Sequence, residues 1–230
     1  MDWKKKYDEI AEKLDIDRND DREATVILNR FIEKRDIDID KLIHRLNRLI
    51  NNKSVIVFGA GPSLRKGVLF VKENKLHSKH TFIAADGSIT ALLEEEILPD
   101  ILVTDLDGRL RDILRANIMG SLTIVHAHGD NINILKRTLP KLRNIIGTTQ
   151  IEPIGRLQNF GGFTDGDRCV FLAVNFKARE ILLSGMDFGN KIGRYSHRYN
   201  KKKKLQKLEI GKKLIEELKK ETDIPIKNLR

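Results

Sequence analysis

Three aspartates in two short turns have the types and spacing that could do chemistry. Asp86 follows the apolar run Phe82–Ala84, and Asp105 and Asp107 follow the apolar run Ile101–Val103. If a helix joins the two runs as parallel strands, both turns lie at the carboxyl edge of one sheet, where open α/β sheets bind ligands. A spacing of two on an extended segment places two side chains on one side. Such carboxylates suit Mg²⁺, which usually arrives with substrate phosphates.

A glycine-rich segment precedes these turns and could bind phosphate. Gly59, Gly61, Pro62 and Ser63 follow an apolar run directly and open a helical pattern at Leu64. Glycine lets the backbone approach a phosphate closely, and the free N–H groups at a helix start attract anions. A tight turn without a ligand is the alternative. The dinucleotide-binding fingerprint would need a third glycine in place of Leu64, and the P-loop pattern is missing.

Two histidines and a polar turn follow a later apolar run. His126 and His128 place two side chains on one side of a strand end, and Asp130 and Asn131 come next. Ligand contact through His126, Asp130 or Asn131 is one interpretation, and ordinary turn chemistry is another. A zinc pair is the third, although the single cysteine, Cys169, excludes a cysteine-based zinc site.

Three later segments add polar groups. The glycine-rich loop Asn159–Phe163 enters a helical pattern for which Thr164 can serve as the N-cap. Asp187 follows a predicted strand and could bring a further acid to the same edge. The run Arg194–Lys204 is basic and also contains Tyr195, His197 and Tyr199. It is either a solvated face or a lid that closes over a phosphate-bearing ligand, with Arg194 among its cations.

Apolar runs that alternate with helical patterns must position these residues. Strands are predicted at Ser54–Phe58, Thr81–Ala85, Ile101–Thr104, Leu122–His126, Asn144–Gly147 and Glu180–Ser184. Helices are predicted at Leu64–Glu73, Ser88–Glu95, Arg109–Ile118, Ile132–Thr138 and Asp165–Phe176, with a last one from about Leu205 to Leu218. This alternation predicts an α/β fold with a Rossmann-like, doubly wound, mostly parallel sheet and helices on both faces.

Residues 1–51 precede the sheet and read as three helices without visible chemistry. Asp20 or Asp21 can cap the second helix, and Asp38 or Asp40 can cap the third. The segment is expected to cover the sheet or to form a homodimer contact. We therefore expect an N-terminal helical segment (1–51), a catalytic α/β domain (52–189), and a basic loop with a C-terminal helix (190–230).

Composition excludes several classes of protein. The chain has 230 residues, of which 40% are hydrophobic, so it can bury a sizeable core. No apolar run approaches a membrane span, and the first residues lack the apolar region of a signal peptide, so a cytoplasmic protein is expected. The net charge is +10, but the basic residues are mixed with 33 acids, and aromatics are only 6%. The pattern therefore argues against nucleic acid as the main partner.

The ordered motifs resemble a family of diphosphate-transferring enzymes. Asp86-Gly87, Pro99-Asp100 and Thr104–Asp107 resemble the core of thiamine pyrophosphokinases, and Thr164–Asp167 resembles a further element of that family. The segments at 59–64, 126–131 and 184–189 depart from it. They are similar to the archaeal 6-hydroxymethyl-7,8-dihydropterin pyrophosphokinases, and the resemblance covers roughly residues 52–200.

This resemblance implies an enzyme that transfers diphosphate from ATP to a pterin alcohol and releases AMP. It implies that Asp86, Asp105 and Asp107 are catalytic and hold Mg²⁺. It also makes Thr164 and Asp165 substrate-binding candidates beside His126, Asp130 and Asn131. Thiamine as the acceptor remains an alternative. A nucleotide-sugar-binding, glycosyltransferase-like protein is a second, because it would also use a glycine loop and an aspartate pair.

Overall fold

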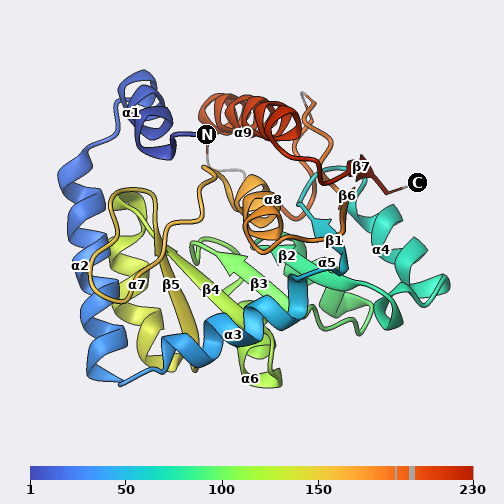
Figure 1. Cartoon of the computed structure of the whole chain (residues 1–230), viewed down its shortest axis with the longest axis horizontal. Helices are drawn as coiled ribbons and strands as arrows, with labels where there is room; N and C mark the ends of the chain where they lie inside the picture. Colours follow the sequence, from blue (N-terminus) through green and yellow to red (C-terminus); the bar gives the residue numbers. More distant parts are fainter. Residues whose placement is uncertain (190, 197–199, 230) are drawn as a thin grey trace.

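The protein is built around a seven-stranded sheet in which every strand pair is parallel (Figure 1). The computed structural model describes residues 1–189, 191–196 and 200–229. The strands are β1 (Ser54–Phe58), β2 (Thr81–Ala85), β3 (Ile101–Thr104), β4 (Leu122–Ala127), β5 (Ile145–Thr149), β6 (Glu180–Ser184) and β7 (Ile226–Asn228). Their order across the sheet is β5-β4-β3-β2-β1-β6-β7. Strands β1 to β5 are buried along their whole length, as continuous apolar runs in a parallel sheet require.

The connecting helices follow from the strand order. They are α4 (Leu64–Glu73), α5 (Ser88–Glu94), α6 (Leu110–Met119), α7 (Ile132–Thr138) and α8 (Asp165–Asn175). Strands β1 to β5 advance in one direction, and the chain then returns to place β6 on the other side of β1. Because the crossovers are right-handed, helices that connect strands in one direction across the sheet lie on one face, and helices that connect strands in the other direction lie on the opposite face. Accordingly α8 packs across β1, β2 and β3, in front of the strands in Figure 1. The predicted doubly wound fold is confirmed.

Three helices precede the sheet, as predicted: α1 (Trp3–Leu14), α2 (Arg18–Lys34) and α3 (Ile39–Ile50). The cap of α2 was predicted wrongly, because Asp17 rather than Asp20 or Asp21 accepts the N-terminal backbone N–H. Asp38 caps α3. Helix α2 runs along β5 and α7, so the segment closes the β5 edge of the sheet.

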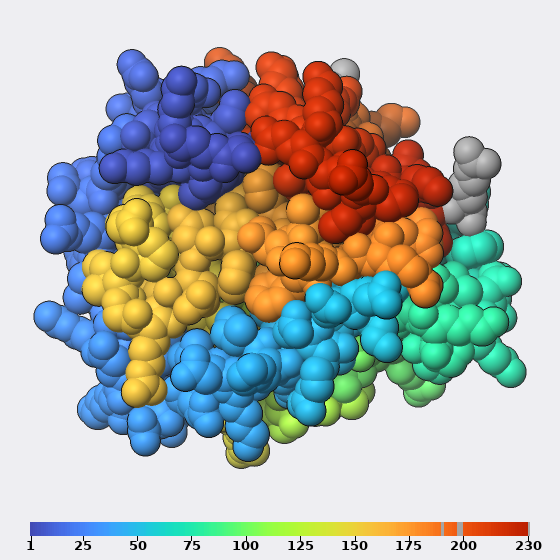
Figure 2. Space-filling model, viewed as in Figure 1, coloured from blue at the N-terminus to red at the C-terminus, as the bar shows by residue number. Residues whose placement is uncertain are grey.

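The C-terminal part differs from the prediction at two points. Helix α9 spans Lys201–Glu221 and begins four residues early, because the Asn200 side chain caps it through the Lys203 N–H. Strand β7 was not predicted, since three residues after Pro225 carry no periodic signal. Helices α1 and α9 lie side by side (Figure 2), and an ion pair joins Lys6 to Glu217 at 3.0 Å.

One buried apolar cluster extends from Tyr7 to Ile226 and takes side chains from the helical segment, the sheet and α9. The division into three parts at residues 51 and 189 therefore stays a prediction. Among the described residues, no helix is both long enough and apolar enough to cross a membrane.

Candidate metal centre at the carboxyl edge

The three predicted aspartates meet at the carboxyl ends of β2 and β3. One carboxylate oxygen from each of Asp86, Asp105 and Asp107 lies within 4.8 Å of the others. Asp86 is 2% exposed, and its Oδ2 accepts hydrogen bonds from Thr104 Oγ1 at 2.7 Å and Gly108 N at 3.2 Å. Its Oδ1 is buried and has no hydrogen-bond partner among the described residues. A buried carboxylate oxygen without a donor is costly, and a cation would offset that cost. The set therefore fits a divalent metal.

The backbone between Asp105 and Asp107 is a turn, so the prediction of an extended segment was wrong. Leu106 has φ +70°, in the left-handed region that side chains with a Cβ adopt at a cost of roughly 1–2 kcal/mol. Leu106 is buried, its N–H donates to Thr104 Oγ1 at 2.8 Å, and Asp107 N donates to Asp105 Oδ1 at 3.2 Å. Strained residues of this kind cluster at functional sites, where the surrounding structure holds them.

The pKa values of two carboxyl groups in the cluster are shifted in opposite directions. Burial, followed by the charges of Asp105 and Asp107, raises the pKa of Asp86 well above its usual range. Burial also acts to raise the pKa of Asp105, but His128, through its hydrogen bond and charge, acts together with Arg168 and Asp107 to lower the net pKa. The His128 Nε2 to Asp105 Oδ2 distance is 3.2 Å. Metal-free, the cluster thus holds more negative charge than its surroundings favour.

The turn after β4 organises this edge from inside the protein. Asn131 Nδ2 donates to Asp105 O at 2.8 Å and to His126 O at 2.7 Å, while its Oδ1 accepts from His128 N at 3.1 Å. His126 is buried and lies 3.0 Å from Thr148 Oγ1 through Nδ1, and burial, followed by Arg168, lowers its pKa well below the usual range. Asn131 is therefore placed to position both histidines, and Asp130 is largely exposed.

The start of α8 brings two further ionisable groups to the edge. Thr164 caps the helix in a reciprocal capping box with Asp167. Asp165 Oδ1 accepts from Arg168 Nη1 at 3.2 Å, and burial, followed by the charge of Asp105, raises the pKa of Asp165 well above its usual range. Arg168 is only 7% exposed. Arg168 was not predicted from the sequence, in which its signal is its position one turn after the cap of α8.

A buried network connects this edge to the N-terminal helices. Asp21 is fully buried, and its carboxylate accepts from Gly129 N at 2.8 Å, from Gln150 Nε2 at 3.0 Å and from the Tyr7 hydroxyl. The Gln150 Oε1 in turn accepts from Arg168 Nη2 at 3.2 Å. Residues 1–51 therefore reach the candidate site through hydrogen bonds, a contact that the sequence alone did not reveal.

The predicted phosphate loop lies where the strand order reverses, between β1 and β6, which is where doubly wound sheets bind ligands. Gly61 N donates to Gly185 O at 2.7 Å, and Ser63 N donates to Asp187 Oδ2 at 3.0 Å. A Cβ on Gly61 would lie 2.5 Å from the backbone oxygen of Gly185, so the close approach of the two loops requires glycine there. Phosphate binding by this loop stays a prediction.

Three other predicted residues of this part of the edge are solvent-facing or already bonded. The Gly59 N–H donates to Ser184 O at 2.8 Å, Pro62 is exposed, and the exposed Arg194 guanidinium stacks 5.6 Å from the Tyr195 ring centre. Residues 197–199 of the predicted lid lie outside the described residues.

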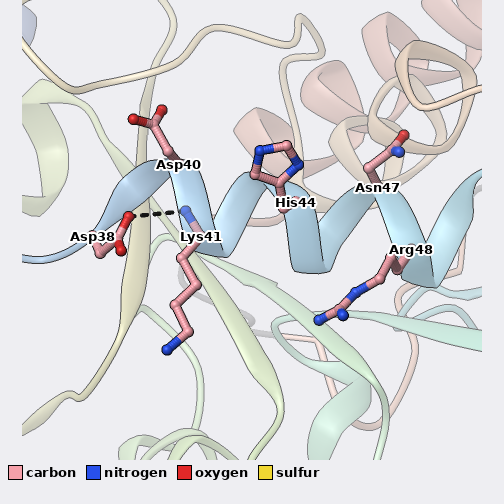
Figure 3. Close-up of a pocket in the computed structure, with 6 residues that line it drawn as sticks. All are labelled: Asp38, Asp40, Lys41, His44, Asn47 and Arg48. Carbon is pink, nitrogen blue, oxygen red and sulfur yellow. Dashed lines mark hydrogen bonds between the residues drawn. The ribbon is translucent and has the colours of Figure 1, made fainter.

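Two hollows lie apart from the aspartate cluster. A cavity of about 10 Å³ adjoins His126 and Arg168, whose Nε2 and Nε atoms have no hydrogen-bond partner among the described residues. That volume admits a water molecule but no bicyclic ring. A surface hollow runs along α3, where the side chains of Asp40 and His44 point away from those of Lys41 and Arg48 (Figure 3). Because these groups do not converge, this hollow offers no shared ligand site.

The chain is similar in sequence to a known family and to several named proteins. A family model described as "6-hydroxymethylpterin diphosphokinase MptE-like" matches residues 31–193. Proteins named 6-hydroxymethyl-7,8-dihydropterin pyrophosphokinase are similar over nearly their whole length. The one from Methanocaldococcus jannaschii is 44% identical over 96% of both chains. The one from Methanothermobacter thermautotrophicus is 45% identical over 97% of both, and the one from Pyrococcus furiosus is 41% identical over 94% of this chain and 93% of its own.

A structural comparison gives a weaker likeness. The structure of the MAf glycosyltransferase from Magnetospirillum magneticum aligns with a TM-score of 0.43 and 16% identity, over 70% of this chain and 29% of that one. This likeness is too weak to support an inference about function.

Proposed function

The chain belongs to the 6-hydroxymethylpterin diphosphokinase MptE-like family, and from this premise we propose that it transfers a diphosphoryl group from ATP to 6-hydroxymethyl-7,8-dihydropterin. The observation that carries the proposal beyond kinship is the convergence of Asp86, Asp105 and Asp107, with Asp86 Oδ1 left without a donor. Oxygen-only sites of this kind suit Mg²⁺ together with substrate phosphates.

The reaction would proceed by in-line displacement at the β-phosphorus of ATP. The hydroxymethyl oxygen of the pterin forms a bond to that phosphorus, the bond from it to the α,β-bridging oxygen breaks, and AMP leaves. The hydroxyl proton is released to water as the new ester forms. Such transfers depend on positioning and on neutralising charge, with little covalent work by the protein. Mg²⁺ held by Asp86, Asp105 and Asp107 would supply the charge that binds and polarises the phosphates.

The remaining residues divide into ligand contacts and positioning groups. Asp165 is our candidate for the edge of the pterin that donates hydrogen bonds, because the charge of Asp105 acts on its carboxyl and its side chain is 12% exposed. His126 and Asp130 remain candidates for contacts with the pterin. Asn131 and Thr164 have their polar groups engaged within the protein and would position the contacts.

The loop at Gly59–Ser63 would cradle part of the triphosphate. Arg194 follows Gly193, whose backbone packs against Ala60 and Gly61 of this loop. Because the Asp187 carboxylate takes up the Ser63 N–H, a phosphate at this loop must displace it. The start of α4 favours an anion in either case, since its free N–H groups carry the positive end of the helix dipole.

A donor and acceptor panel tests the assignment. The protein is incubated with Mg²⁺, a nucleotide donor and an acceptor, and the nucleotide products are separated by ion-exchange chromatography. ATP with the pterin alcohol should give AMP in amounts equal to the pterin consumed, whereas thiamine or a UDP-sugar should not react. AMP formation with thiamine alone, or release of UDP from the sugar donor, would replace the proposed function by one of these alternatives.

A further inference from the structure

We infer that Lys207 on α9 binds the polyphosphate of the nucleotide, opposite the carboxylates of Asp86, Asp105 and Asp107. The inference rests on the proposed function and adds to it a cation from a helix outside the predicted catalytic domain.

The packing of α9 directs Lys207 toward the carboxyl edge. Gly211 lies against the start of α8, where a Cβ would approach Asp167 Oδ1 to 2.8 Å and Thr164 Oγ1 to 3.4 Å. Lys207 precedes Gly211 by four residues and therefore shares its face of the helix, about 6 Å further along the axis. It extends past the capped start of α8, beside the residues that form the candidate site.

The surroundings of the Lys207 ammonium point to an anion that it does not yet contact. Nζ lies 5.8 Å from the Phe163 ring centre and 3.9 Å from Asp130 Oδ2, at the outer limit of an ion pair. Burial lowers the pKa of Lys207, Asp130 and Asp105 act against this, and Lys203 and Arg168 add to the lowering. An ammonium that is partly desolvated, and whose ion-pair partner among the described residues lies at this limit, gains most when a charged ligand arrives.

Charge balance at the edge calls for such a cation. A nucleoside triphosphate carries more negative charge than one Mg²⁺ neutralises, and diphosphoryl transfer moves charge onto the departing AMP. Asp86, Asp105 and Asp107 add further negative charge on the metal side. Arg168 is engaged by Asp165 and Gln150. Lys207 is less exposed than the neighbouring Lys203, with side-chain exposures of 30% and 48%, so solvent screens it less.

Titration calorimetry with α,β-methylene ATP and Mg²⁺ tests the inference, because this analogue cannot be cleaved at the bond that breaks in the reaction. The variants are Lys207→Met, Lys207→Gln and Lys207→Arg. The matched control is Lys212→Met, on the same helix but half exposed and paired with Glu216. Both neutral variants should bind the analogue roughly 10- to 100-fold more weakly, as expected for a charge-assisted contact. Lys207→Arg should recover part of the affinity, and Lys212→Met should match the wild type.

Binding of the pterin alcohol, followed by its own fluorescence, should be unchanged in all four variants, which separates loss of a phosphate contact from misfolding. Wild-type affinity for the analogue in both neutral variants would overturn the inference, while product analysis could still support the proposed function. If the neutral variants lose affinity for the analogue but the wild-type protein does not consume the pterin, the proposed function is wrong and the phosphate contact stands. If the wild type does not bind the analogue, both are wrong.

Discussion

At the scale of single residues, the candidate centre depends on a turn that the protein must hold against its own preference. Leu106 is buried with a positive φ, and the hydroxyl of Thr104 bonds both its N–H and the Asp86 carboxylate. This arrangement turns two aspartates that are separated by one residue toward a third from the neighbouring strand. Strain at a buried apolar residue is explained when its neighbours must face a common ligand.

Loss of either turn carboxylate should abolish most of the activity without unfolding the protein. Asp105→Asn and Asp107→Asn keep the side-chain shape but remove charge that would hold the metal. Steady-state rates should fall on the order of 10²-fold or more, as for other lost charge-stabilising groups. Raising Mg²⁺ should recover part of the rate if metal affinity is the lost quantity. Normal activity of both variants at low Mg²⁺ would show that these carboxylates are not ligands.

Replacing the buried member of the cluster should stabilise the metal-free protein. In Asp86→Asn the amide oxygen can still accept from Thr104 and Gly108, while the repulsion from Asp105 and Asp107 is removed. We expect a rise in melting temperature of roughly 2–4 °C, equivalent to about 1 kcal/mol in a chain of this size. Added Mg²⁺ should raise the melting temperature of the wild type but not of the variant. A lower melting temperature of the variant in a chelator would contradict this account.

At the scale of elements, the N-terminal helices form part of the candidate site. Asp21 of α2 binds the backbone of Gly129 and the amide of Gln150, and Tyr7 of α1 donates its hydroxyl to Asp21. A buried carboxylate needs all of these donors, because each unmade bond leaves a charge without compensation. The helices thereby fix the turn that holds His128 against Asp105.

Removing the Tyr7 hydroxyl should test this connection. Tyr7→Phe leaves the Asp21 carboxylate short of one donor and should lower the free energy of unfolding by roughly 1–3 kcal/mol. At a temperature where the variant is fully folded, its kcat should still fall while its KM for the pterin changes less. Tyr195→Phe is the matched control, since that hydroxyl bonds Glu94 at the surface and should change stability by less than about 0.5 kcal/mol. An unchanged kcat in folded Tyr7→Phe would give the network a structural role only.

The sequence was sufficient to predict β1 to β6 and α4 to α8, because continuous apolar runs and turn residues mark buried parallel strands. It was also sufficient to predict that Asp86, Asp105 and Asp107 lie at one edge of the sheet, because that follows from strand direction alone. It could not place Asp21, Gln150 or Arg168, which meet only when the β5 edge is closed by α2. The positive φ of Leu106 and the short β7 depend on neighbours that are distant in sequence, so no local sequence pattern predicts them.

At the scale of the whole molecule, three separate parts of the chain surround one sheet edge. The carboxylates after β2 and β3 form the metal side, and the loops after β1 and β6 meet at the point where the strand order reverses. Helix α9 packs against α8 and brings Lys207 toward this edge. Opposite charges on two sides of one edge suit a polyphosphate, because a metal on the carboxylates and the cation can share its charge.

Phosphorus NMR of a single reaction mixture tests the central claim most directly. The wild-type protein is mixed with ATP, Mg²⁺ and 6-hydroxymethyl-7,8-dihydropterin, and the phosphorus signals are followed over time. We predict that the three ATP signals decline together while AMP and two coupled signals of a pterin diphosphate ester appear in equal amounts, and that Asp105→Asn shows neither product on the same timescale. Growth of ADP with a pterin monophosphate would contradict the account, because attack would then occur at the γ-phosphorus.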